Sequence, residues 1–128
     1  MNNFIQLLYI GVGGFCGAIS RWLVSKSTSN WLGAFPLGTL LVNTSGSLIL
    51  GFIMYSVAYG KNISPESRNF IAVGFIGAFT TMSTFSYETV RLLELKDYTL
   101  FSINFLSNII LCLAAIVVGR YLAMALFE

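Results

Sequence analysis

Five hydroxyl side chains within seven positions, residues 80–86, are the groups in this sequence best placed to do chemistry. They belong to an uncharged run, residues 69–87, which is just long enough to cross a bilayer as a helix. Because Thr and Ser compete for backbone hydrogen bonds and Gly gains little from helical order, we expect this helix to break at mid-membrane. Broken backbone at that depth must be buried in protein or line a wet cavity, which favours an ion path. The alternative is an intact helix whose hydroxyls bond to its own carbonyls.

The composition is typical of a membrane protein. Of 128 residues, 56% are hydrophobic and 9% are charged, and the net charge is +2. A charge so small and scattered excludes a nucleic-acid-binding protein. The chain has no His, and Cys16 and Cys112 both lie in apolar runs, so we expect neither a zinc site nor a disulfide. The length leaves room for one transmembrane domain, residues 1–128.

Four apolar spans predict an all-α membrane protein with four transmembrane helices. We expect these helices over residues 4–24, 38–60, 69 to about 93, and 98–119. Before the third span, Ser64 can cap the helix and Pro65 suits its first position. The connections are short, so neighbouring helices should run antiparallel.

Basic residues near the span ends are almost balanced between the two membrane sides. One side carries Lys61, Arg68 and Arg120, and the other carries Arg21, Lys26, Arg91 and Lys96. Since this bias sets the orientation of a membrane protein, so small a difference predicts insertion in both orientations. Opposite orientations can pair as an antiparallel dimer. The alternative is one fixed orientation, in which case the difference of one basic residue between the two sides carries no information.

Small and charged residues in the first span indicate close packing near a charge. Gly13 and Gly17 form a GxxxG pair, which lets two helices approach closely in lipid. Arg21 follows one turn later. A charge at this depth must either snorkel to the interface or face a wet vestibule.

Polar stripes on the second and fourth spans should face inward. The shared-face positions are Thr39, Asn43, Gly46 and Ser47 in the second span, and Asn104, Asn108 and Cys112 in the fourth. Both stripes could serve only for hydrogen bonds between helices.

Carboxylates are nearly absent from the predicted membrane interior, where Glu88 is the one candidate. Cation-coupled and proton-coupled transporters need buried carboxylates. The buried polar groups here are mainly amides, hydroxyls and one guanidinium, with weakly positive aromatic edges. Donors without acids suit a small anion, whose lost hydration they can replace.

Three stretches together resemble the CrcB/Fluc family of small fluoride channels. They are GGFCGAISR at residues 13–21, GTLLVN at 38–43, and GFIGAFTTMSTFSYE at 74–88. The resemblance covers three helices in the same order and spacing. It implies a non-enzymatic, multi-pass protein of the cell (inner or plasma) membrane that exports fluoride passively. It also implies an antiparallel dual-topology homodimer with two pores, and a structural Na⁺ at the dimer interface held by the carbonyls of Gly77 and Thr80.

The resemblance further implies a set of pore residues, with Phe85 as an aromatic wall and Arg21 at a vestibule. The others are Thr39, Asn43, Met82, Ser83, Thr84, Ser86, Glu88, Asn108 and Cys112. Three positions depart from the family pattern. Met82 stands where the family usually has its first pore phenylalanine, and Cys112 and Ile116 stand where Ser and Thr are common.

These departures keep a heterodimer with a paralogous subunit open as an alternative to the homodimer. A small dual-topology multidrug antiporter would need a Glu in the first span, where this chain has none. A purely structural membrane subunit is the third possibility.

Overall fold

All regular elements in the described part of the chain, residues 3–127 of the computed structural model, are helices. Four segments are long and apolar enough to cross a membrane: α1 (Asn3–Thr28), α2 (Leu37–Ala58), the compound segment Pro65–Glu94, and α6 (Tyr98–Phe127). The compound segment consists of α3 (Pro65–Arg68), the π-helix η1 (Asn69–Ile76), α4 (Gly77–Phe79) and α5 (Met82–Glu94). The chain is therefore an all-α, multi-pass membrane protein, as its composition predicts.

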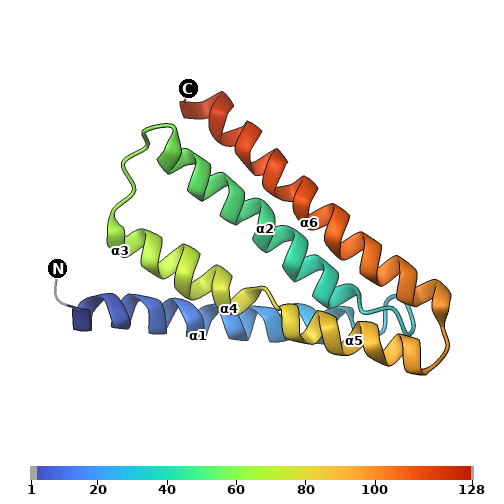
Figure 1. Cartoon of the computed structure of the whole chain (residues 1–128). Helices are drawn as coiled ribbons and strands as arrows, with labels where there is room; N and C mark the ends of the chain where they lie inside the picture. The colour runs from blue at the N-terminus through green and yellow to red at the C-terminus, as the bar shows by residue number, and fades with distance from the viewer. Residues whose placement is uncertain (1–2, 128) are drawn as a thin grey trace.

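Two helix pairs diverge from one end of the molecule (Figure 1). In one pair α1 packs against η1 and α4, and in the other α2 packs against α6. At the end where the pairs meet, α5 contacts both α2 and α6. This convergence brings side chains from three separate helices together.

Glycines form the contact between α1 and η1. A Cβ atom added to Gly13 would overlap the carbonyl oxygen of Phe70, and one added to Gly17 would overlap that of Phe75. Gly74 of η1 faces the backbone of α1 in the same way. The two backbones touch directly, so the close packing predicted from the GxxxG pair is confirmed.

The first helix continues beyond the predicted residue 24, to Thr28. In its last turn the hydroxyls of Ser27 and Thr28 donate to the carbonyls of Leu23 and Val24, at 2.7 and 2.8 Å. In an α-helix these carbonyls also accept the backbone N–H groups of the same two residues, so both hydroxyls are satisfied within the helix itself.

The fourth helix also extends further than predicted, to Phe127 instead of residue 119. Arg120 does not end it, because its side chain stays exposed and its Nε donates to Tyr59 Oη at 3.4 Å. The guanidinium carbon lies 5.5 Å from the ring centroid of Tyr55. At the start of the third segment, the predicted Ser64 cap is confirmed, since Ser64 Oγ accepts the N–H of Ser67 at 3.2 Å.

The backbone of the third segment leaves the helical conformation at two residues. Thr80 has φ −80° and ψ 157°, and Thr81 has φ −152° and ψ 116°, so both are extended. A new helix, α5, starts at Met82, and Thr81 caps it by accepting the N–H of Thr84 at 3.2 Å. The depth of these residues in a bilayer stays a prediction.

Candidate functional site

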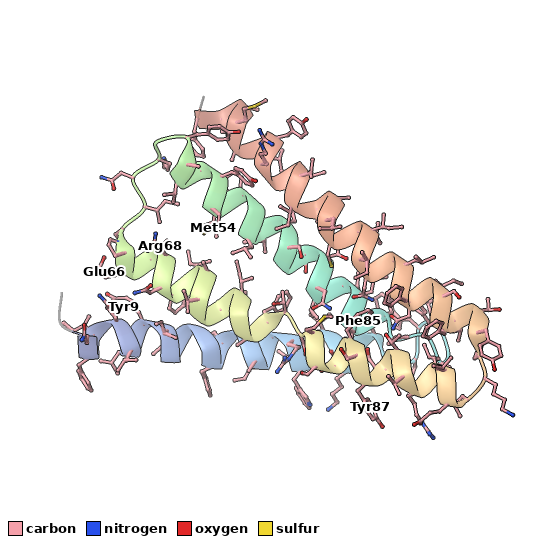
Figure 2. The ribbon with its side chains drawn as sticks, viewed as in Figure 1. Tyr9, Met54, Glu66, Arg68, Phe85 and Tyr87 are labelled. Carbon is pink, nitrogen blue, oxygen red and sulfur yellow. The ribbon has the colours of Figure 1, made fainter. Side chains whose placement is uncertain are left out.

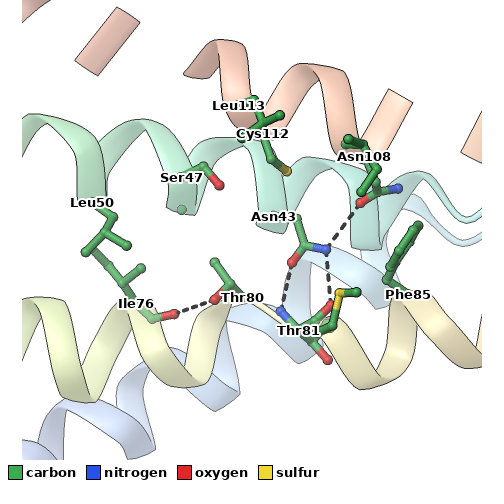
Figure 3. A pocket seen from close by; sticks show the side chains of 13 residues that line it. Asn43, Ser47, Leu50, Ile76, Thr80, Thr81, Phe85, Asn108, Cys112 and Leu113 are labelled. Carbon is green, nitrogen blue, oxygen red and sulfur yellow. Dashed lines mark hydrogen bonds between the residues drawn. The ribbon is translucent and has the colours of Figure 1, made fainter. Parts of the chain in front are cut away.

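The side-chain amide of Asn43 pairs with the extended backbone of Thr81. Thr81 N–H donates to Asn43 Oδ1 at 2.7 Å, and Asn43 Nδ2 donates to Thr81 O at 3.1 Å (Figure 3). The amide therefore bonds both backbone groups of one residue, as a neighbouring strand would. Buried backbone groups outside regular structure need such partners, so α2 supports the chain where the third segment leaves the helix.

The break leaves two carbonyls without their usual helical donors. In an unbroken helix, Thr81 N–H would bond Gly77 O and Thr84 N–H would bond Thr80 O. Here Thr81 N–H goes to Asn43, and Thr84 N–H goes to the Thr81 hydroxyl. The two carbonyls affected are those of Gly77 and Thr80, which the family resemblance assigns to a sodium ion.

Arg21 lies against the same stretch of backbone. Its side chain is half-buried, and Nη1 lies 3.5 Å from Thr80 O. The guanidinium therefore reaches from α1 toward the extended residues. A carbonyl oxygen has two lone pairs, so Thr80 O can receive this donor and still face a cation on its other side.

A cavity of about 430 Å³ opens between α2, the extended residues, α5 and α6 (Figure 3). Its lining comprises Asn43, Gly46, Ser47, Leu50, Ile76, Thr80, Thr81, Met82, Phe85, Asn108, Ile109, Cys112 and Leu113. The structure thus brings together most of the polar stripe of α2, two of the three stripe residues of α6, and the start of α5. This lining contains no carboxylate and no basic side chain.

Two amides, Asn43 and Asn108, contribute to the polar part of the cavity wall. Asn43 Nδ2 donates to Asn108 Oδ1 at 3.2 Å, in addition to its bond to Thr81 O. Asn108 is 4% exposed, and its Nδ2 donates to Asn104 O and Asn104 Oδ1, both at 3.1 Å. The hydrogen bonds between helices that the stripes could serve are therefore present. Both N–H groups of Asn43 and of Asn108 have protein acceptors.

Phe85 of α5 lines the cavity and begins an aromatic row that continues on α6. Phe85 is 4% exposed, and its ring centroid lies 6.3 Å from that of Phe105, with 24° between the ring planes. Phe105 stacks in turn on Phe101. Figure 2 shows Phe85 directed toward α2 and α6, whereas Tyr87 points away from them. Met82, one turn before Phe85, also lines the cavity but is 69% exposed.

Three predicted pore hydroxyls lie outside this cavity. Ser83, Thr84 and Ser86 are exposed, and none of them belongs to the lining. Ser86 Oγ donates to Met82 O in its own helix at 2.9 Å. Their pore roles stay predictions.

Thr39 and Glu88 meet at the end of α2 nearest the loop between α1 and α2. Thr39 Oγ1 is buried and donates to Glu88 Oε1 at 2.9 Å. Glu88 Oε2 is buried, and among the described residues it has no hydrogen-bond partner. Glu88 borders a second, smaller cavity of about 130 Å³, lined also by Ala34, Pro36, Tyr87, Arg91, Leu92 and Leu95. This pair is thus separate from the amide wall.

Sequence reasoning missed three residues of this region as site residues. Thr81 holds Asn43, and Asn104 connects Asn108 to Thr89. Asn104 shares a helical face with Asn108, and that spacing was the available signal. Ile116, one of the departures from the family pattern, lies outside the cavity lining and packs its backbone near Gly51.

Comparison with known proteins identifies the family. A family model described as CrcB-like protein, Camphor Resistance (CrcB), matches residues 8–120. A Methanococcus aeolicus protein named fluoride-specific ion channel FluC is 46% identical over 123 residues, which cover 96% of this chain and 98% of that protein. A Methanocaldococcus jannaschii protein of the same name is 48% identical over 125 residues, with 96% and 98% covered. The chain belongs to the CrcB family.

Proposed function

We propose that this protein is a channel, not an enzyme, that lets fluoride leave the cell passively across the cell membrane. The observation that carries the proposal is the wall of the larger cavity, in which the amides of Asn43 and Asn108 face Phe85 and no carboxylate is present. The relatives named as fluoride-specific ion channels support the same ligand. Without carboxylates in the wall, an anion meets no fixed negative charge there.

Hydrogen-bond exchange explains how an ion could enter this wall without being trapped. A fluoride ion that loses water needs N–H or O–H donors in its place. Asn43 Nδ2 can supply them only by releasing Thr81 O or Asn108 Oδ1. Binding is then an exchange of acceptors with a small net gain, which suits conduction because the ion must also leave. The positive edge of the Phe85 ring adds attraction without a competing acceptor.

Purified protein in liposomes provides the test of this function. We expect release of fluoride down its gradient without ATP or a pH difference, and much slower release of chloride. A fluoride flux that stops when the pH difference is removed would instead indicate an antiporter. No flux of either ion above that of protein-free liposomes would indicate a structural subunit.

The proposal includes an antiparallel dimer with one pore on each side. The near-equal charge count on the two sides supports dual insertion, and the apolar outer faces can meet either lipid or a second chain. Reporters on the C-terminus should register on both sides of the membrane. A reporter found on one side only would contradict dual insertion and favour a paralogous partner of opposite orientation.

The most detailed part of the proposal is a structural Na⁺ between two chains, held by the carbonyls of Gly77 and Thr80. The loss of their helical donors supports this assignment, and carbonyls without carboxylates suit a monovalent ion. Such an ion would bind carbonyl oxygens of both chains, offset the repulsion between their dipoles and so stabilise the dimer. The unfolding temperature of the purified protein should then be higher in NaCl than in KCl of equal concentration. Equal temperatures would argue against the ion.

A further inference from the structure

A chain of hydrogen bonds runs behind the cavity wall and continues beyond the residues that line it. It starts at Thr81 N–H, which donates to Asn43 Oδ1 at 2.7 Å. Asn43 Nδ2 donates to Asn108 Oδ1 at 3.2 Å, and Asn108 Nδ2 donates to Asn104 Oδ1 at 3.1 Å. Each amide receives a hydrogen bond at its oxygen and passes one on from its nitrogen. The chain thus has one direction through three amides.

The last two bonds return this chain to α5. Asn104 Nδ2 donates to Thr89 Oγ1 at 2.9 Å, and the Thr89 hydroxyl donates to Phe85 O at 2.6 Å. Asn104 is fully buried at 0% exposure, and Thr89 is 7% exposed. Neither residue lines the larger cavity. Their polar atoms therefore serve this connection and do not face the proposed ion path directly.

Backbone groups fix the direction of the chain at both ends. A side-chain amide can usually be turned by 180° with little change in shape, which exchanges its oxygen and nitrogen. Here the first group, Thr81 N–H, can only donate, and the last group, Phe85 O, can only accept. Turning any single amide would place two donors or two acceptors against each other. The orientation of Asn43 and Asn108 is thus determined by contacts on both sides of Phe85.

We infer that Asn104 and Thr89 are positioning residues for the ion path. They hold the Asn108 amide with its oxygen toward Asn43, and they tie α6 to α5 one turn after Phe85. Asn43 ties α2 to Thr81, one turn before Phe85, so the aromatic ring is held from both directions. This inference rests on the proposed fluoride conduction. It assigns a role to two residues that the ion itself need not touch.

The sharpest variants change one hydroxyl. Thr89→Val keeps the side-chain shape but removes the acceptor of Asn104 Nδ2, whereas Thr89→Ser keeps the hydroxyl. Since a buried donor without a partner is costly, we expect Thr89→Val to slow fluoride release from liposomes by about tenfold. Thr89→Ser should stay within about twofold of the original protein, because the hydrogen bond can still form. Ser102→Ala on α6 is the control, since its hydroxyl is exposed and donates to Tyr98 O in its own helix.

A second substitution separates positioning from general loss of stability. Asn104→Leu removes the same connection from the α6 side. If both residues act through one chain, the double variant Asn104→Leu/Thr89→Val should conduct about as slowly as the slower single variant, because coupled sites are not additive. Size-exclusion chromatography checks that each variant is dimeric, and fluoride release is then compared at equal amounts of dimer. Should Asn104→Leu fail to fold, the two Thr89 variants still decide the question.

The outcomes distinguish the inference from the function on which it rests. An original protein that releases no fluoride contradicts the proposed function, and this assignment with it. A conducting original protein with normal flux in Thr89→Val overturns the assignment alone. Low flux in Thr89→Ser would also overturn it, because the hydroxyl would then not be the group that matters. A double variant whose loss is the product of the two single losses would overturn it as well, because the two residues would then act independently.

Discussion

Two regions of the molecule hold helices together in different ways. One is the contact of α1 with η1, and the other is the amide wall between α2, α5 and α6. Both hold helices together in a setting where lipid gives no hydrophobic advantage to helix contacts. The first uses glycines, and backbone meets backbone at Gly13 and Gly17. The second uses side-chain amides and leaves a cavity of about 430 Å³ beside them. Close packing leaves no room for a ligand, whereas an amide wall gives both support and exchangeable donors.

We expect substitutions in these two regions to have different effects. A substitution in the glycine contact should affect folding and assembly first. The added side chain would meet backbone atoms, which cannot move aside as a flexible side chain could. A substitution in the amide wall should affect ion passage more than assembly. Unsatisfied groups there can turn toward the open cavity and its water.

The largest effect is expected from adding one methyl group to the glycine contact. Gly17→Ala should destabilise the protein by roughly 3 kcal/mol or more, since the new atom would overlap Phe75 O. Gly11→Ala makes the same change in the same helix, where no atom lies within 4 Å of the added group. That control should be neutral or gain about 0.5 kcal/mol from its better helix propensity. Thermal unfolding of both variants measures the difference, and equal unfolding temperatures would remove the distinction drawn for this contact.

An intermediate effect is expected at Asn43, which both supports the backbone of Thr81 and supplies hydrogen-bond donors to the cavity. Asn43→Leu removes the partners of Thr81 N–H and Thr81 O, which should cost about 1–2 kcal/mol because water in the cavity can replace part of the two lost bonds. It also removes donors from the cavity, so fluoride release should stop even in variants that remain dimeric. Ser45→Ala, on the same helix with an exposed hydroxyl bonded to Leu41 O, provides the control. Normal release in a stable Asn43→Leu dimer would place the ion path elsewhere.

The smallest effect is expected at Met82. Its side chain is 69% exposed and has no aromatic edge, so it contributes volume to the cavity wall and little else. Met82→Leu should cost less than about 1.5 kcal/mol and leave fluoride release within about twofold. Met82→Phe restores the residue usual in the resembling family and should be tolerated or faster. Loss of flux in Met82→Leu would show that the thioether itself matters.

Local sequence patterns predicted the helices and the inward faces, but not which groups bond across the structure. The spacing of Asn104 and Asn108 placed them on one face, and the GxxxG pair predicted the close contact of α1. The pairing of Asn43 with Thr81 joins residues 38 positions apart, so no local pattern contains it. The helix ends at Thr28 and Phe127 were missed because both helices continue through polar or charged residues that lie beyond the apolar runs. The family resemblance is confirmed by the match over residues 8–120.

The central claim is that fluoride passes along the wall formed by the amides and Phe85. The most direct measurement compares fluoride release from liposomes that contain equal amounts of the original protein or of Phe85→Ile. This substitution keeps much of the apolar volume and removes the positive ring edge. We expect rapid release by the original protein, and release at the protein-free rate by a variant that is still dimeric on size exclusion. Equal release by the two proteins would contradict the claim.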